Sequence, residues 1–421
     1  MGSSEGATTD VHRGPRPRAG APRRPALVCA FPVPRALPFP ESGEVVGRAW
    51  LETHDLADGE VSGSHLAIDR RGGRLTVTDL GSKNGTWVDG QRLVPKEPVA
   101  LEEGSRLRLG RTLFVVRHGL RGDLAPAPPL GELVGPYGLR ALAEALAGLS
   151  RQRPDNVLIT GETGAGKELC ARAVAAILRP DKPYAAVNAA ALSEGVFESQ
   201  LFGHVEGAFS GAGKAQPGLF VAHDGGTLFL DEIGELELEQ QAKLLRVLDN
   251  REVLAVGASK PRHVDLSFVA ATNRDLPALV EAGSFRADLF ARLRAAHLEV
   301  PPLRDRVEDL LPILRALAER AGAPLDEAHV EVEAVERLLG HDWPRNVREL
   351  ANVLAAARRA DPSPGLSLWS LEDLIGEAVP RALTEAAVEA AIEASGGNLS
   401  RAAAELGISR GKLLRFRKRK A

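Results

Sequence analysis

Residues 156–168 read NVLITGETGAGKE, an apolar run followed by a glycine-rich segment that ends in lysine and glutamate. The apolar run predicts a buried strand, and ELCARAVAAIL at residues 168–178 predicts a helix after the glycines. The spacing G-x-x-x-x-G-K in this setting is that of a phosphate-binding loop, whose backbone N–H groups and helix N-terminus face the phosphates. Candidate nucleotide ligands are Gly161, Glu162, Thr163, Gly164, Ala165, Gly166, Lys167 and Glu168. Lys167 is expected to reach the β- and γ-phosphates, whereas Glu168 stands where a metal-binding Ser or Thr is usual.

Two more apolar runs, TLFLDEI at residues 227–233 and LSFVAATN at 266–273, predict further strands of the same domain. Such runs alternating with helices indicate a parallel sheet covered on both faces, an α/β fold. Asp231 and Glu232 end a buried strand, where a carboxylate is costly unless it has a task. We expect Asp231 to hold Mg²⁺ and Glu232 to orient the water that attacks ATP. A helix N-cap is the alternative role for this pair.

Six motifs in order, GETGAGKE, GGTLFLDEI, AATNRDL, FRADLFARL, VPPLRDR and WPRNVREL, resemble the AAA+ domain of bacterial enhancer-binding proteins. These proteins are ATPases that activate RNA polymerase carrying sigma-54. The resemblance covers about residues 133–359 and implies a P-loop α/β subdomain at 133–300 with a helical lid at 301–362. In that family a glutamate follows the loop lysine, as Glu168 does here.

The resemblance also implies roles for residues outside the phosphate loop. Asn188 would pair with Glu232 and relay the nucleotide state, and Asn273 would sense the γ-phosphate. Arg348 would be the sensor arginine of the lid. Arg286 and Arg292 would be arginine fingers that reach a neighbouring subunit, which implies a homo-oligomeric ring, a hexamer; a solvated helix face is the plainer reading of these two arginines.

Three residues depart from the family pattern. Arg345 stands where glycine is usual, Ser267 where arginine is common, and Val205 where glutamate is usual. None of the three removes a catalytic group, and Val205 and Ser267 bear on the coupling between nucleotide state and loop position.

The stretch GHVEGAFSGAGKAQPG at residues 203–218 places a phenylalanine among glycines and alanines, where a helix or strand is poorly supported. It resembles the GAFTGA loop of the same family, with serine for threonine. The resemblance implies that the loop contacts sigma-54 and that Phe209 supplies apolar binding area. The contact residues would be Gly207, Ala208, Phe209, Ser210, Gly211 and Ala212.

Residues 27–118 have the alternating pattern and turn signals of a β-sandwich. GRA at 47–49, VSGSH at 61–65 and DLGSKNGTWVDG at 79–90 resemble a forkhead-associated (FHA) domain, which binds phosphothreonine peptides. The resemblance implies ligand contacts from Arg48, Ser62, Lys83 and Asn84, with His65 and Thr86 bracing the loops. Gly63 stands where arginine often adds a phosphate contact.

The C-terminal stretch GGNLSRAAAELGISRGKLLRFRKRKA indicates helix, turn, helix, and it resembles a Fis-type helix-turn-helix at residues 381–421. From Arg410 onward it has seven basic residues and no acidic one. A solubilising tail is one reading, and contact with DNA is the other. The expected DNA contacts are Ser409, Arg410, Lys412, Arg415 and Arg417.

The 421 residues with a net charge of −3 suggest about three domains and no simple polycation. Residues 1–26 are expected to be disordered, and 119–132 and 363–380 to be linkers, from their Gly and Pro content. Two distant cysteines favour neither zinc nor disulfides, and no apolar run is long enough to span a bilayer. A cytoplasmic protein is therefore expected, with a signal peptide around ALVCAFPV as a minor alternative.

Together these features predict an ATP-hydrolysing activator of sigma-54 RNA polymerase that binds DNA and takes its signal through the FHA domain. Two other classes stay open. One is a non-enzymatic phosphopeptide- and DNA-binding protein with an inactive ATPase domain. The other is a AAA+ protein that remodels a different client.

Overall fold

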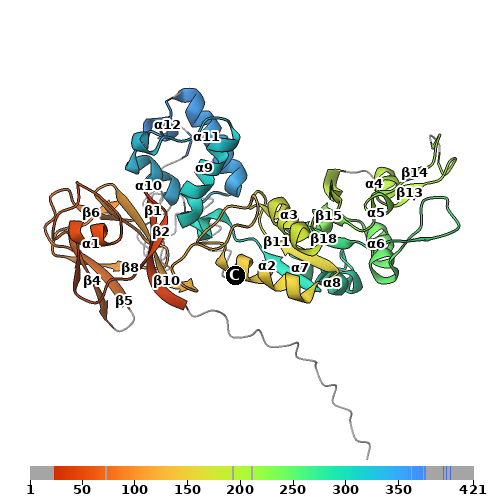
Figure 1. Cartoon of the computed structure of the whole chain (residues 1–421), viewed down its shortest axis with the longest axis horizontal. Helices are drawn as coiled ribbons and strands as arrows, with labels where there is room; N and C mark the ends of the chain where they lie inside the picture. Colours follow the sequence, from red (N-terminus) through yellow and green to blue (C-terminus); the bar gives the residue numbers. More distant parts are fainter. Residues whose placement is uncertain are drawn as a thin grey trace, which may run out of the picture.

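The computed structural model describes residues 23–71, 74–191, 194–209, 212–361, 363–372 and 374–375, with isolated positions at 392, 395 and 399. Three bodies follow one another along the chain (Figure 1): an N-terminal β-sandwich, an α/β domain and a helical lid that lies between them. This is the multidomain fold class expected from the sequence for the part of the chain that the structure describes. Within that part, no helix combines the length and apolar character that crossing a membrane requires.

The N-terminal domain is formed by two antiparallel sheets with strand orders β2-β1-β10-β9-β6-β7 and β3-β4-β5-β8. Leu27, Leu66, Val77 and Phe114 project between the sheets into one buried core. The elements are β1 (Arg23–Phe31), β2 (Arg35–Pro38), β3 (Glu44–Val46), α1 (Arg48–Thr53), β4 (Leu66–Arg71), β5 (Arg74–Asp79), β6 (Thr86–Val88), β7 (Gln91–Arg92), β8 (Pro98–Leu101), β9 (Arg106–Leu109) and β10 (Thr112–Arg121).

Both ends of this sandwich extend beyond the predicted limits of 27 and 118. Strand β1 begins at Arg23, inside the tail predicted to be disordered, because Arg23 and Arg24 pair with Arg121 and Leu120 of β10. Backbone pairing of this kind needs no apolar side chain, so composition did not indicate it.

The segment predicted to be a linker, residues 119–132, is also held in place. The guanidinium of Arg140 donates to the carbonyls of Arg121, Asp123 and Ala125. Leu124 and Leu130 also pack against buried clusters, so side-chain contacts with the following segments hold this proline-rich stretch.

The α/β domain has a five-stranded parallel sheet in the order β12-β15-β18-β11-β19. Alternate residues of one strand enter different cores, so that Val157 packs with α2 and α3 while Leu158 packs with the opposite helices. The strands are β11 (Asn156–Thr160), β12 (Tyr184–Asn188), β15 (Thr227–Asp231), β18 (Ser267–Thr272) and β19 (Ala296–Glu299). The helices are α2 (Arg140–Gln152), α3 (Lys167–Leu178), α4 (Glu194–Phe202), α5 (Leu219–Ala222), α6 (Leu238–Asn250), α7 (Leu276–Glu281) and α8 (Ala287–Leu293).

Two short hairpins project from the end of this domain farthest from the sandwich (Figure 1). They are β13 (Gly203–His204) with β14 (Gln216–Pro217), and β16 (Glu252–Val253) with β17 (Arg262–His263). Short 3-10 turns are η1 (Ala189–Ala191), η2 (Ile233–Glu235), η3 (Leu303–Asp305), η4 (Val307–Asp309) and η5 (Glu327–His329).

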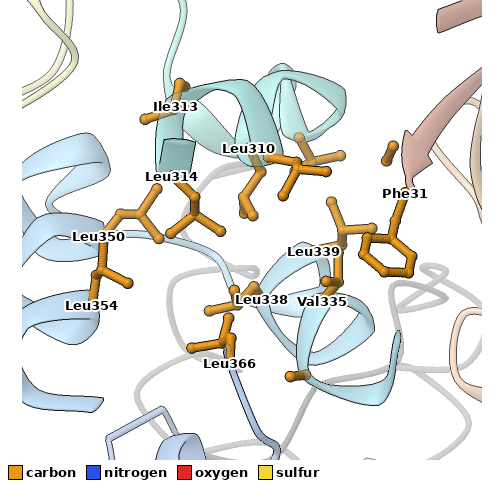
Figure 2. Close-up of a cluster of buried hydrophobic side chains, with 14 of the residues drawn as sticks. Phe31, Leu310, Ile313, Leu314, Val335, Leu338, Leu339, Leu350, Leu354 and Leu366 are labelled. Carbon is orange, nitrogen blue, oxygen red and sulfur yellow. The ribbon is translucent and has the colours of Figure 1, made fainter. Parts of the chain in front are cut away.

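The lid consists of α9 (Leu310–Arg320), α10 (Val332–Gly340), α11 (Asn346–Ala360) and the short α12 (Trp369–Glu372). The lid therefore extends beyond the predicted limit of 362 into residues predicted to be a linker, because Leu366 and Leu371 are buried in its core. Its core is continuous with residues of the N-terminal sandwich, and Figure 2 shows Phe31 of β1 beside Val335 and Leu339 of the lid. The lid therefore packs against both other bodies.

Candidate nucleotide site and recognition loops

The predicted nucleotide residues follow four adjacent strands of the parallel sheet. Gly161 follows β11, Asn188 ends β12, Asp231 ends β15 and Asn273 follows β18. Because the carboxyl ends of parallel strands meet at one edge of a sheet, these residues gather there. The tertiary structure thus brings together segments that lie more than a hundred residues apart.

The phosphate loop depends on two glycines in the left-handed region, Gly164 at φ 78° and Gly166 at φ 111°. A Cβ atom at Gly164 would lie 2.3 Å from the carbonyl oxygen of Arg345, so this position also needs glycine for space. Gly164 accepts a hydrogen bond from the backbone N–H of Val347 at 3.1 Å. The loop therefore lies directly against the first turn of α11 in the lid.

Lys167 is buried at the start of α3 and points back over the loop. Its Nζ donates to the carbonyl of Gly161 at 3.0 Å and lies 3.9 Å from Oε1 of Glu232. The backbone of Glu232 is in the left-handed region at φ 54°, which is unusual for a non-glycine residue. Its Oε2 atom is buried and has no hydrogen-bond partner among the described residues. Such an unsatisfied carboxylate oxygen points to a ligand or water at this place.

The two predicted asparagines have different surroundings. Nδ2 of Asn273 donates to Oγ1 of Thr163 in the phosphate loop at 2.9 Å. Asn188 lies opposite Asp231 in the register of β12 and β15, but its Oδ1 accepts from the N–H of Ala190. No hydrogen bond between Asn188 and Glu232 is present among the described residues, so their pairing stays a prediction.

The predicted arginine fingers are exposed and each is paired within its own subunit. Arg286 forms an ion pair with Asp288 at 2.7 Å, which raises the pKa of Arg286. Arg292 pairs with Asp249 at 3.2 Å and donates to the carbonyl of Leu248. Contacts of this exposed kind contribute little free energy, so the structure leaves both guanidinium groups accessible.

The predicted contact loop closes the hairpin of β13 and β14. The N–H of Gly207 donates to the carbonyl of Ala212 at 2.8 Å, and the carbonyl of Phe209 accepts from the N–H of Ala212 at 3.0 Å. The side chain of Phe209 is 46% exposed, although its ring meets the ring of His204 edge-on at 5.1 Å between centroids. A large apolar side chain therefore stands half in solvent at a far end of the molecule.

The four predicted phosphopeptide ligands gather at one end of the sandwich. The N–H of Arg48 donates to the carbonyl of Ser62 at 3.0 Å, and Oγ of Ser62 accepts from the N–H of Lys83 at 3.1 Å. Nδ2 of Asn84 donates to the carbonyl of Glu60 at 2.7 Å. The Arg48 side chain is exposed beside the carbonyls of residues 59 and 61. The turns that carry these residues therefore form one continuous surface.

Two buried titratable groups hold these turns. The imidazole of His65 accepts from the N–H of Ser62 through Nδ1 and lies 3.0 Å from the carbonyl of Gly85 through Nε2. Burial lowers the pKa of His65, which favours the neutral ring that this arrangement needs. Burial also acts to raise the pKa of Asp79, but hydrogen bonds from Ser82 and Thr86 outweigh it and hold that pKa below its ordinary value.

Comparisons with known proteins agree with this geometry. Family models match as a sigma-54 interaction domain at residues 139–299, an FHA domain at 45–110, a AAA+ ATPase lid domain at 304–387 and a Fis-family bacterial regulatory protein at 385–418. The transcriptional regulatory protein ZraR of Escherichia coli K12 is 40% identical over 314 residues, which is 70% of this chain and 67% of that protein. The chain belongs to the sigma-54-dependent transcriptional regulators.

Other relatives in this family are similar over shorter parts. The sigma54-dependent transcriptional regulator SfnR of Pseudomonas fluorescens is 47% identical over 214 residues, 50% of this chain and 58% of its own. The crystal structure of NtrX from Brucella abortus in complex with ATP has a TM-score of 0.52 and 31% identity, covering 68% of this chain and 69% of NtrX. This chain spans only about half the length of several further curated relatives.

In this regulator, three residues on the lid side of the phosphate loop contact it although no role was predicted for them from the sequence. Nδ2 of Asn346 donates to Oε2 of Glu162 and to the carbonyl of Thr163, while its Oδ1 accepts from the N–H of Leu303. Arg304 forms a two-point ion pair with Glu162, and Arg306 donates to the carbonyl of Ala165 at 2.8 Å. All three residues belong to the family motifs VPPLRDR and WPRNVREL, so these motifs could have indicated them as candidate site residues. Arg348, which was assigned, is exposed on α11 beside Gly164.

Two departures from the family pattern have a local explanation. Arg345 has φ −111°, a backbone that any residue adopts, so glycine is not required there. Ser267 is buried in β18, and its Oγ accepts from Nε of Arg179 at 3.3 Å. The guanidinium of Arg179, the residue at the C-terminal end of α3, therefore lies beside this strand, where the family commonly has an arginine of its own.

The sandwich and the hairpin also contain supporting residues that were not predicted. A Cβ atom at Gly47 would lie 1.9 Å from the carbonyl oxygen of Gly63, so glycine is needed before Arg48. Oδ2 of Asp58 accepts from the N–H of Arg111 and from Oγ1 of Thr112, both at 2.8 Å. His204 is buried at the base of the hairpin, between Oγ of Ser199 and the carbonyl of Lys214.

Several predicted residues lie outside the described part of the chain. They are Ser210 and Gly211 of the contact loop and all the predicted DNA contacts, Ser409, Arg410, Lys412, Arg415 and Arg417. Their roles stay predictions. The described residues contain no cluster of three or more His, Cys, Asp or Glu that could hold a metal ion by themselves, and Cys29 and Cys170 are free and buried.

Proposed function

We propose that this regulator hydrolyses ATP in a ring and uses the energy to open promoter DNA with sigma-54 RNA polymerase. One observation carries the proposal. The nucleotide site at the carboxyl edge of the sheet and the half-exposed Phe209 belong to the same domain. In the sequence, the hairpin that carries Phe209 lies between β12 and β15, which are neighbours in the sheet. Both strands end in residues of the nucleotide site, so a change there has a short path to the hairpin.

The phosphate loop fits the polyphosphate of ATP. The left-handed glycines give the loop a tight turn, and the N-terminus of α3 that follows it adds positive potential. Among the described residues, the ammonium group of Lys167 has two carbonyls and the distant Glu232 carboxylate as partners, so a phosphate oxygen would be a better one. These features support ATP as the nucleotide.

Catalysis would depend on the two carboxylates that end β15. Asp231 would hold Mg²⁺, which neutralises phosphate charge when it is bound. Oε2 of Glu232 is buried and has no hydrogen-bond partner among the described residues, and it would accept the proton of an attacking water molecule. Asn273, which is bonded to Thr163, would align the loop with this water. The N–H of Glu232 donates to Oδ1 of Asp231 at 3.0 Å, which keeps the two carboxylates in fixed relation.

Completion of the site would require a second subunit. Arg286 and Arg292 lie on or beside α8, away from the subunit's own phosphate loop, and their exposed ion pairs can be exchanged for contacts with a neighbour's phosphate. An arginine supplied in trans stabilises charge that develops during phosphoryl transfer. We therefore infer a homo-oligomeric ring, with a hexamer as the expected size.

Phe209 would supply the contact with sigma-54. Burying a phenylalanine side chain contributes about 1.5–3 kcal/mol, which a polar loop tip cannot offer. Backbone hydrogen bonds of Gly203 and Val205 to Val256 hold the base of the hairpin, and the Gly207–Ala212 bond closes the loop that carries Phe209. A movement of this loop as the nucleotide changes would bring Phe209 to sigma-54 or withdraw it.

The input and the DNA contact belong to the two ends of the chain. The surface of Arg48, Ser62, Lys83 and Asn84 supports recognition of a phosphothreonine peptide, because charged and amide donors gather there. The Fis-type match supports DNA binding by the C-terminal residues, which would position the protein at enhancer-like sites in the cytoplasm.

An open-complex assay tests the proposed function. Purified full-length protein, sigma-54 polymerase and a promoter fragment would be mixed with ATP and Mg²⁺, and open DNA detected by permanganate footprinting. We expect opening only with hydrolysable ATP, and none when sigma-70 polymerase replaces sigma-54 polymerase. ATP turnover without opening would indicate a AAA+ protein with another client, and no turnover would indicate an inactive ATPase domain.

A further inference from the structure

The N-terminal sandwich and the lid share one apolar core. Strand β10 is apolar on both faces: Phe114 and Val116 project into the sandwich, while Leu113 and Val115 project toward the lid. Figure 2 shows Phe31 of the neighbouring strand β1 packed beside Val335 and Leu339 of α10. Strand β10 is therefore buried on both faces and ties the sandwich to the lid, so we expect the two domains to move together.

Farther along β10, Arg117 forms buried polar contacts with the segment that leads into the lid. The guanidinium of Arg117 donates to both carboxylate oxygens of Glu308 and, at 3.0 Å, to the carbonyl of Asp305. Arg117 is 8% exposed and Glu308 is 2% exposed. A third partner, Glu103 of the sandwich, accepts from Nη1 at 3.0 Å. Breaking one side of such a buried pair is costly, because the other charge is left without a partner.

The segment that Arg117 holds, residues 303–309, is also the segment that holds the phosphate loop. Arg304 pairs with Glu162, and Arg306 donates to the carbonyls of Ala165 and Val134. Arg304 lies in η3 and Arg306 between η3 and η4, and both side chains contact the phosphate loop. The carboxylate of Glu308 and the carbonyl of Asp305, from the same segment, bind Arg117.

We propose that Arg117 is a positioning residue for the nucleotide site. It fixes residues 303–309 from the FHA side, and Arg304 and Arg306 then hold the phosphate loop in its binding shape. The FHA domain is on this view a structural component of the ATPase as well as a sensor. Loss of Arg117 weakens nucleotide binding, although this residue touches neither the nucleotide nor the loop.

A purely stabilising role for the Arg117–Glu308 pair is the alternative, and the two roles differ in a measurable way. A stabilising pair changes the melting temperature but not the nucleotide affinity of the molecules that remain folded. A positioning pair changes the dissociation constant of ADP and the KM for ATP more than it changes kcat, because the loop must be reordered before each binding event.

The experiment uses the full-length chain with the substitution Arg117→Ala. A fluorescent ADP analogue reports the dissociation constant at a temperature well below melting, and steady-state ATPase rates report KM and kcat. We expect the dissociation constant to rise about tenfold, the change that 1.4 kcal/mol produces. Arg121→Ala is the matched control: it lies on the same strand, but its pair with Glu144 does not touch residues 303–309, and we expect affinity to stay within about twofold of wild type.

Two milder variants keep the test decisive if Arg117→Ala does not fold. Arg117→Lys retains the charge but cannot contact both Glu308 oxygens and the Asp305 carbonyl, and Glu308→Gln retains the shape but weakens the pair. Each should raise the dissociation constant by an intermediate amount, with faster amide hydrogen exchange confined to residues 303–309 and 161–166. A lower melting temperature with unchanged ADP affinity in the folding variants would overturn the proposal.

Discussion

Nζ of Lys167 lies 3.9 Å from Oε1 of Glu232, and the other oxygen of this carboxylate is buried without a hydrogen-bond partner among the described residues. The lysine therefore orients one oxygen and leaves the second available for a water molecule. This relationship between the phosphate loop and the end of β15 is the basis of the first prediction.

Glu232→Gln should leave ATP binding intact and reduce turnover by at least about a hundredfold, because an amide cannot accept the proton of the attacking water. Phosphate release measures turnover, and a fluorescent nucleotide measures binding. Glu239→Gln is the control, since Glu239 is an exposed residue of α6 that pairs with Lys243, and the substitution should leave turnover near wild type. Turnover of Glu232→Gln within a few-fold of wild type would contradict the assignment.

Phe209→Ala should spare ATPase activity and strongly reduce sigma-54 contact and open complexes. The ring of Phe209 is half exposed, and removing about 1.5–3 kcal/mol of burial lowers binding roughly tenfold or more. Val94→Ala, an exposed apolar residue of the sandwich, is the control and should have no effect on opening. Normal activation by Phe209→Ala would assign the hairpin to another task.

Arg286→Ala and Arg292→Ala should each be inactive alone and should inhibit wild-type subunits in mixed rings. The reason is that each arginine would act in the site of its neighbour, so one variant subunit disables a site that it does not contain. Titrating variant into wild type while measuring ATPase activity checks this. Activity that falls only in proportion to the wild-type fraction would argue against a shared site.

Arg48→Ala should reduce the affinity of the chain for phosphothreonine peptides at least about tenfold, since a charged hydrogen bond contributes about 1.5–3 kcal/mol. Calorimetric titration with phosphorylated and unphosphorylated peptide libraries measures the phosphate-dependent gain. Arg35→Ala, whose pair with Asp55 is not among the predicted ligands, is the control. If no peptide shows a phosphate-dependent gain with the wild-type chain, the input must be of another kind.

His65 should make the sandwich less stable in mild acid. Burial lowers its pKa in the folded protein below 6.5, so between that pKa and 6.5 the unfolded chain binds a proton that the folded chain does not. The stabilisation is therefore complete above pH 6.5 and is lost as the pH falls below it. The nearby carboxylates of Asp58 and Asp79 reduce the shift without reversing it.

Melting temperatures of wild type and His65→Gln between pH 5 and 8 test this expectation. Glutamine can accept from Ser62 and donate to Gly85 but does not titrate, so its own melting curve lacks this contribution. The wild-type advantage should shrink as the pH falls from 7 to 5.5. A difference that is independent of pH would show that His65 does not titrate in this range.

Local motifs account for what was predictable in the nucleotide site. A strand, a glycine loop, Lys167 and a helix follow one another within about twenty residues, so their mutual geometry follows from the chain itself. Asp231 and Glu232 were likewise predictable, because they directly follow an apolar strand. Phe209 was predicted to be exposed from the glycines around it, and the structure confirms that exposure. Parallel pairing of β11, β15 and β18 then places Gly161, Asp231 and Asn273 at one edge of the sheet.

Contacts between distant segments were decided only by the tertiary structure. The sequence of β10 shows an apolar run, but not that one face meets the sandwich and the other the lid. Arg117 and Glu308 are 191 residues apart, and each is an ordinary charged residue until both are buried together. Local propensity carries no information about such a pair, because its free energy arises from desolvation and geometry that exist only after the domains dock. No single motif therefore predicts that residues 303–309 link the FHA domain to the phosphate loop, because that link exists only in the folded protein.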